Sequence, residues 1–253
     1  MSPLMRALSA ESVKLRGTLA LWMCLIAPTV VVALYVLQMS FSKMGDHALG
    51  DPAAAWRLFA QSCLALWAIL MLPLFVTLEA ALLAALEHNE RLWKHLLALP
   101  VPRRVHYLAK LVALAAMVLL ATGVLAVLIP IGGGVLMLVK PAMGLAGAPP
   151  WEFIATRGAG LFVAALLIVA LHTWISIRWR SFTVAVATGM TATVMGFLIG
   201  QSERFGHWFP WTMPIQILAG EGKYVAFVLV AGLAGGALVT VFGLWDYLRR
   251  EFA

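Results

Sequence analysis

Two ionisable side chains, Glu79 and His172, lie inside long apolar runs of the sequence, where an acid and a base could together transfer a proton. Glu79 is the only carboxylate well inside such a run, and His172 lies in another run far along the chain. Ionisable groups are costly in hydrocarbon and usually face a partner, a cavity or water. For each residue, an interhelical contact therefore competes with a place on a substrate path.

Sequence motifs of catalytic and metal-binding sites are missing. HExxH, GxSxG, CxxC and GxxxxGK[ST] do not occur in the sequence, although they mark zinc proteases, serine hydrolases, thiol or zinc sites and P-loop ATPases. The spacing of His88, His95 and His106 fits no metal-ligand pattern either. The sequence therefore predicts no catalytic residue, no metal site and no nucleotide cofactor bound by this chain itself.

An aromatic stretch, RFGHWFPWTMP at residues 204–214, is a third candidate for binding. It contains Trp208 and Trp211, and tryptophan is enriched where helices meet the membrane surface. Anchoring at that surface explains the stretch. The receipt or release of an amphipathic substrate is the alternative interpretation, and it adds both tryptophans to the possible substrate path.

The composition indicates which structural elements hold these residues in place. The chain has 253 residues, of which 63% are hydrophobic and 11% charged, and its mean hydropathy is +0.95, whereas soluble domains carry about 25% charged residues. Apolar runs of membrane-spanning length must be helical in lipid, because only helices and closed barrels satisfy their backbone groups there. The sequence thus predicts an all-α polytopic membrane protein, a single domain over residues 1–253. The six predicted spans are 18–39, 59–86, 111–130, 158–177, 182–200 and 224–245.

Positive charge predicts the orientation of these spans. Of the 18 Lys and Arg residues, six fall on one side of the predicted spans and the remaining twelve on the other. The side richer in Lys and Arg is normally cytoplasmic, so both termini are expected in the cytoplasm. The net charge of +7 then reflects orientation, and no nucleic-acid partner is predicted. The six on the outer side are Lys43, Arg57, Lys140, Arg157, Arg204 and Lys223.

Local patterns refine this plan. Residues 3–17 place Leu4, Leu8 and Leu15 on one side of a helix, which predicts an amphipathic N-terminal helix in the membrane interface; a plain anchor for the first span is the alternative. Gly132–Gly134 follows Pro130 and predicts a break in the third helix. Glycine pairs spaced four apart, at 196/200 and 232/236, predict close helix packing. The two cysteines fall at different membrane depths and are expected to be free thiols.

The stretch EHNERLWKHLLALPVPRR, residues 87–104, interrupts the apolar runs with charge. As a helix it would be two-sided, and Pro100 and Pro102 would end it. The residues on its apolar side are Leu92, Trp93, Leu96, Leu97 and Leu99. Those on its polar side are Glu87, Arg91, Lys94 and His95. The residues alone leave two readings open, an interfacial turn or a helix that docks in a groove of a cytoplasmic partner.

This stretch resembles the first cytoplasmic loop of ABC-2-type permeases, in the pattern Glu87-His88, Trp93-Lys94, Leu99-Pro100 and Arg103, followed by Tyr107 and Lys110. The closest resemblance is to the lantibiotic-immunity and bacitracin-resistance branch. The motif SIRWRSF at residues 176–182 is similar to that branch's short inner loop, and FPWTMP at 209–214 is similar to its outer segment. The resemblance covers essentially the whole chain.

The resemblance implies a permease subunit in a bacterial cytoplasmic membrane, exporting an amphipathic antimicrobial peptide or similar compound. Two permease copies, or a related six-span pair, would assemble with two copies of a separate ATPase that binds ATP and Mg. Segment 87–104 would be the coupling segment that seats in the ATPase. The residues assigned to this coupling by resemblance are Glu87, His88, Arg91, Trp93, Lys94, Leu97 and Arg103.

Three alternatives stay open from the sequence. The first keeps the permease but changes its cargo to a lipid, a drug or a cofactor-maturation substrate. The second is a membrane enzyme with Glu79 and His172 as an acid/base pair, which requires those side chains to lie within reach of each other. The third is a membrane scaffold or sensor, in which residues 87–104 dock a signalling partner and nothing is transported.

Overall fold

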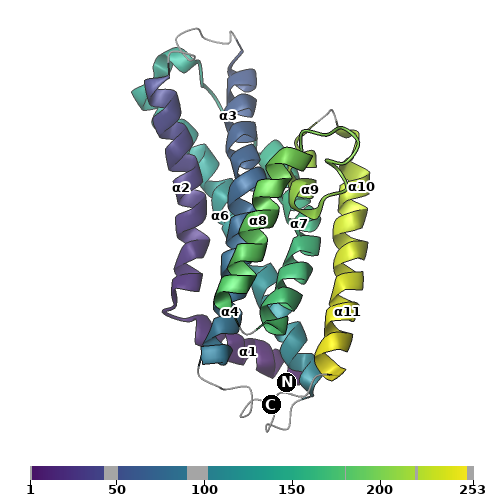
Figure 1. Ribbon diagram of the computed structural model, residues 1–253. Coiled ribbons are helices and arrows are strands. Elements are labelled where there is room, and N and C mark those ends of the chain that lie inside the picture. The colour runs from purple at the N-terminus through teal and green to yellow at the C-terminus, as the bar shows by residue number, and fades with distance from the viewer. Residues whose placement is uncertain (1, 43–50, 90–101, 180, 220–221, 250–253) are drawn as a thin grey trace.

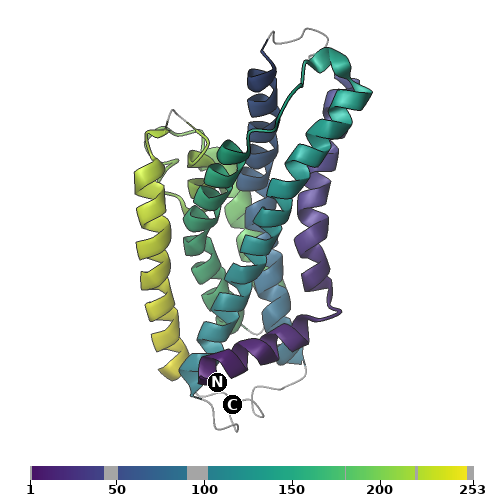
Figure 2. The same cartoon turned by 180° about the vertical axis from the view of Figure 1, so that it is seen from behind.

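The computed structural model describes residues 2–42, 51–89, 102–179, 181–219 and 222–249, with the backbone alone described for residues 86–89. These residues form helices and connecting turns without a strand, which confirms the predicted all-α class. Figures 1 and 2 show an upright helical bundle with helix α1 lying across one end. At the opposite end, α2, α3 and α6 extend beyond the tops of α8 and α10, so the bundle is stepped.

The described helices and turns divide between the two halves of the chain. The first half of the chain comprises α1 (Pro3–Leu15), α2 (Leu19–Phe41), α3 (Pro52–Leu66), the π-helical turn η2 (Trp67–Met71), α4 (Leu72–Asn89) and α6 (Arg103–Val139). The second half comprises the 3-10 turn η3 (Pro141–Met143), α7 (Trp151–Arg178), α8 (Phe182–Ile199), the 3-10 turn η4 (Pro210–Thr212), α9 (Met213–Gln216), α10 (Val225–Val230), the π-helical turn η6 (Ala231–Gly235) and α11 (Gly236–Arg249).

Six helices among the described residues are long and apolar enough to cross a membrane, which agrees with the six predicted spans. They are Leu19–Phe41, Pro52–Ala85, Arg103–Val139, Trp151–Arg178, Phe182–Ile199 and Val225–Arg249. Several continue beyond the apolar runs of the sequence. Helix α6, with 37 residues, is roughly 55 Å long at about 1.5 Å per residue, which exceeds a hydrocarbon core of about 30 Å.

The predicted break in the third span is wrong. Helix α6 runs without interruption through Pro130 and the triple glycine to Val139. A Cβ atom at Gly132 would crowd Val32, and one at Gly133 would overlap the ring of Trp56. These glycines therefore let α6 approach α2 and α3 closely, a packing role that outweighs glycine's weak helix propensity.

The glycine pair at 232 and 236 brings the last span against α7, as predicted. A Cβ atom at Gly232 would meet the backbone of α7, with Ala164 Cα only 2.9 Å away. A Cβ atom at Gly236 would lie 3.2 Å from the carbonyl group of Leu166. Backbone-to-backbone contact of this kind is how small residues stabilise helix pairs in membranes.

Hydrogen bonds and glycine geometry explain where α1 begins and ends. The Ser2 hydroxyl accepts a hydrogen bond from the Met5 N–H at 3.3 Å, so it caps the first turn. The chain then turns at Gly17, whose φ of 74° is in the left-handed region that favours glycine. The turn lets α1 lie across the bundle end while α2 runs along the bundle (Figure 2).

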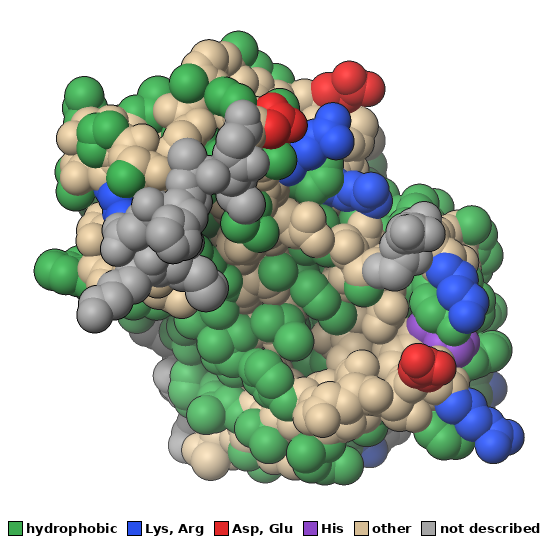
Figure 3. Space-filling model, turned by 90° about the horizontal axis from the view of Figure 1, so that it is seen from above, with side chains coloured by type: hydrophobic (Ala, Val, Ile, Leu, Met, Phe, Trp, Pro, Cys, Tyr) green, Lys and Arg blue, Asp and Glu red, His purple; other side chains and the backbone are tan. Residues whose placement is uncertain are grey.

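The far end of the bundle, opposite α1, is mainly apolar in its middle. Figure 3 shows this face with hydrophobic side chains across its central hollow and charged side chains near its edges.

Cys24 and Cys63 are buried free thiols within the spans, as predicted.

Candidate functional site

The segment that resembles a coupling loop connects α4 to α6. Glu87 and His88 lie in the last turns of α4, and Arg103 is the first residue of α6. Both helix ends lie at the end of the bundle that α1 crosses (Figure 1). The other four predicted coupling residues lie outside the described residues: Arg91, Trp93, Lys94 and Leu97.

Lys110, in the third turn of α6, connects the two helices that flank this segment. Its Nζ donates a hydrogen bond to the carbonyl oxygen of Leu83 on α4 at 3.1 Å. The same Nζ lies 3.6 Å from Glu11 Oε2 on α1. Lys110 and Glu11 are both buried, with 4% and 7% of their surface exposed. Three helices thus meet at one buried ammonium group.

Sequence reasoning missed Glu11, although a signal was present. Glu11 falls on the apolar side of the N-terminal helix, in the series Leu4, Leu8, Glu11, Leu15 that repeats at three and four residues. A carboxylate in an apolar stripe usually has a buried partner. Besides Lys110, that carboxylate pairs with Lys14 of its own helix at 2.9 Å.

Helix α6 also contacts the last span at the same end. The ring of Tyr107 packs on that of Tyr247 with centroids 5.8 Å apart. A Cβ atom at Gly243 would overlap the Tyr107 hydroxyl group, so only glycine leaves room for this tyrosine. The first turns of α6 are therefore fitted closely against α11.

Asp246 on α11 holds the end of α7. Its Oδ2 accepts a hydrogen bond from Trp174 Nε1 at 3.1 Å and lies 3.4 Å from Arg178 Nε. The ring of Trp174 also makes edge contacts with Trp179 and Phe242. The end of the bundle crossed by α1 therefore contains polar links that join α1, α4 and α6 on one side and α7 and α11 on the other.

His172 is a fully buried interhelical contact between α7 and α4. Its Nε2 lies 3.2 Å from Thr77 Oγ1. Because the Thr77 hydroxyl donates its hydrogen to the Pro73 carbonyl, Nε2 is the donor to Thr77 and carries the ring proton. A Cβ atom at Gly189 would overlap both Thr77 and the His172 ring, so α8 packs directly over this pair.

Glu79 is fully buried in α4, and neither carboxylate oxygen has a hydrogen-bond partner among the described residues. It is two positions after Thr77, about 200° around the helix, so it faces away from the side that holds His172. The structure therefore does not bring Glu79 and His172 together as an acid/base pair. Of these two residues, Glu79 remains the candidate for the substrate path.

The two tryptophans predicted on a substrate path occupy different environments. Trp211 is buried with 8% exposed, and its ring packs edge-on against His172 with centroids 5.6 Å apart. Trp208 is 62% exposed and borders an open cleft of about 490 Å³. The other residues lining that cleft are Leu198, Ile199, Ser202, Phe205 and Phe209. Trp208 thus belongs to a surface cleft, whereas Trp211 belongs to the core.

Within the described part of the chain, no three His, Cys, Asp or Glu side chains gather in a group that could hold a metal ion. At the α1 end, charged side chains link helices, in Lys110 with Glu11 and in Arg178 with Asp246. The arrangement at the α1 end therefore offers mechanical connections between helices.

Comparison with known proteins gives one family. A family model described as "ABC-2 family transporter protein" matches residues 7–198, from within α1 to the last turn of α8. No curated protein and no solved structure matches the chain.

Proposed function

We propose, on the premise that this chain belongs to the ABC-2 family of transporter proteins, that it is the permease subunit of an ATP-driven exporter. ABC-2 permeases are transmembrane subunits without an ATPase site of their own, and they generally work with an ATPase subunit. The observation that carries the proposal is the family match over residues 7–198. The six helices able to span a membrane support it.

The proposed assembly has two permease copies, identical or a related pair, and two copies of a separate ATPase. Residues 87–104 form the coupling segment, with Trp93 and Lys94 in contact with the ATPase. Closure of the ATP-bound ATPase pair pushes this segment, and α4 and α6 carry the movement into the membrane. Support for this route is that the segment is joined at each end to a long helix, as the bounds of α4 and α6 show.

We place the α1 end of the bundle in the cytoplasm of a bacterium, with the protein in the cytoplasmic membrane. The excess of Lys and Arg in the segments that include both termini supports this orientation. The end of α4, the start of α6 and the end of α11 lie at the same end of the bundle as α1 (Figures 1 and 2). In this orientation α1 lies along the inner surface of the membrane.

We propose an amphipathic antimicrobial peptide as cargo. The exposed aromatic cleft beside Trp208 lies at the outer end in this orientation and suits an apolar side chain at the membrane surface. Stimulation of ATPase activity by bacitracin or a lantibiotic in proteoliposomes would support a peptide cargo. Stimulation by a short-chain phospholipid alone would assign the transporter to lipid.

Co-purification tests the permease assignment itself. The tagged chain in mild detergent is expected to retain an ATPase, and the double variant Trp93→Ala with Lys94→Ala is expected to lose at least about 90% of it, a loss of roughly 1.4 kcal/mol in binding free energy. The matched control, Trp151→Ala with Lys223→Ala, changes the same residue types at exposed positions of the opposite end. Equal retention by both variants, each inserted at wild-type level, would contradict the coupling assignment.

A further inference from the structure

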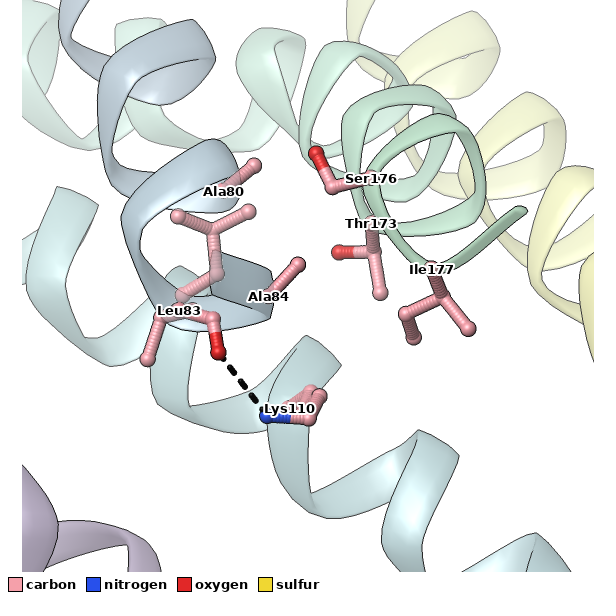
Figure 4. A pocket seen from close by; sticks show the side chains of 8 residues that line it. Ala80, Leu83, Ala84, Lys110, Thr173, Ser176 and Ile177 are labelled. Carbon is pink, nitrogen blue, oxygen red and sulfur yellow. Dashed lines mark hydrogen bonds between the residues drawn. The ribbon is translucent and has the colours of Figure 1, made fainter. Parts of the chain in front are cut away.

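The buried ammonium group of Lys110, on α6, links α1 and α4. Figure 4 shows Lys110 reaching from α6 to the Leu83 carbonyl near the end of α4. On its other side, the same Nζ lies 3.6 Å from Glu11 of α1. The Lys110 side chain on α6 therefore contacts α4, the other helix that flanks the coupling segment, and also α1.

Burial makes this link difficult to exchange for water. A buried ammonium group is stable only with compensating partners, and removal of one partner leaves an uncompensated charge. Glu11 is itself buried, and Lys14 beside it is partly exposed and belongs to the same helix. When α6 shifts, the favourable course for α1 is therefore to shift with it and keep Glu11 near Lys110.

A small cavity lies beside Lys110. Figure 4 shows this cavity, bounded on α4 by the small side chains of Ala80 and Ala84. On α7 the cavity is bounded by Thr173, Ser176 and Ile177. Lys110 therefore borders the point where α4, α6 and α7 meet.

We propose that Glu11 and Lys110 are positioning residues that make α1 move together with the ends of α4 and α6. This inference rests on the proposed function, because the ATPase that acts on the coupling segment supplies the movement. Helix α1 then moves along the inner membrane surface in each ATPase cycle, and does not only anchor the first span.

Hydrogen exchange of residues 3–15 tests the link first in the chain alone, reconstituted in nanodiscs without any ATPase. Lys110→Met and Glu11→Gln are each expected to speed exchange in α1 about tenfold, because they release it from α6. The double variant is expected to match the stronger single variant, since both changes break one interaction. The control Lys14→Met, which alters the same carboxylate's other partner, is expected to leave exchange within about twofold.

The complete transporter tests whether α1 moves with the ATPase cycle. In the complex with its ATPase, trapping with ATP and vanadate is expected to change exchange in residues 3–15 and in residues 103–110. In the Lys110→Met complex, the change in residues 103–110 persists and the change in residues 3–15 is lost. Equal α1 exchange in Lys110→Met and wild type, in the isolated chain or in the trapped complex, would overturn the inference. Failure of the wild-type chain to bind any ATPase would instead refute the proposed function, and the nanodisc experiment would still decide whether the link exists.

Discussion

Replacing Glu79 by methionine is expected to stabilise the protein while lowering its transport activity. Both carboxylate oxygens are fully buried without a hydrogen-bond partner among the described residues. A buried polar group without a partner costs about 1–3 kcal/mol relative to an apolar group of similar shape. Methionine has nearly the same length and no strong polar atom, so it removes this cost without leaving a large cavity.

The expected gain is measurable. A change of 1 kcal/mol shifts Tm by about 2–4 °C in a chain of about this length, so the gain is a few degrees to roughly ten. The two buried free thiols, Cys24 and Cys63, provide the assay, because a thiol-reactive dye labels them only as the bundle unfolds. Glu79→Gln serves as the control: its amide is equally buried and polar, and its Tm is expected to stay within about 1 °C of wild type.

Two outcomes would refute this reasoning. A lower Tm for Glu79→Met than for Glu79→Gln would mean that the carboxyl group has a stabilising partner. A higher Tm with unchanged transport would remove Glu79 from the substrate path. Proteins retain residues that lower stability mainly at functional sites. If transport is unchanged in Glu79→Met, no function accounts for the stability that Glu79 costs.

Three further predictions follow from the packing and from the exposed cleft. Gly232→Leu is expected to lower stability by about 1–3 kcal/mol because its side chain would meet the α7 backbone, whereas Gly134→Ala, with no atom near its Cβ position, is expected to be neutral in the same thiol assay. Trp211→Ala is expected to destabilise by about 3–5 kcal/mol because the side chain is buried in the core. Trp208→Ala is expected to change stability by less than about 0.5 kcal/mol but to weaken peptide stimulation of the ATPase in proteoliposomes; unchanged stimulation would argue against the cleft as a cargo site.

The sequence predicted the spans because hydrophobic length is a local property, and the backbone in lipid has few alternatives to helix. It did not predict the continuous α6 at Gly132–Gly134. A glycine run favours a break by local propensity, but its real partners, Val32 and Trp56, lie on other helices. The π-helical turns η2 and η6 were missed for the same reason, since neither has a signature in the order of residues.

For the candidate site residues too, the sequence predicted local properties but not their partners on other helices. The polarity of Glu79 and His172 inside apolar runs predicted either an interhelical contact or a place on a substrate path for each. Their opposite directions on the bundle depend on the spacing of Thr77 and Glu79 along α4. Glu11 was detectable in principle, as a carboxylate within the apolar stripe of α1. Its partner Lys110 is about a hundred residues away, and only the tertiary structure brings the two together.

Polar side-chain contacts join helices at both ends of the bundle. Within hydrocarbon, helices gain little from apolar contact with each other over contact with lipid, so directional polar links decide which helices stay together. Among the described residues, links of this kind lie at the α1 end in Lys110 with Glu11 and Leu83, and in Asp246 with Trp174 and Arg178. At the opposite end, Lys140 donates to the Met39 carbonyl and Arg157 to the Ile217 carbonyl. At the α1 end, Glu11 joins α1 to Lys110 of α6, and the same ammonium group joins α6 to the Leu83 carbonyl of α4. A force that enters between α4 and α6 therefore reaches α1 through one buried side chain.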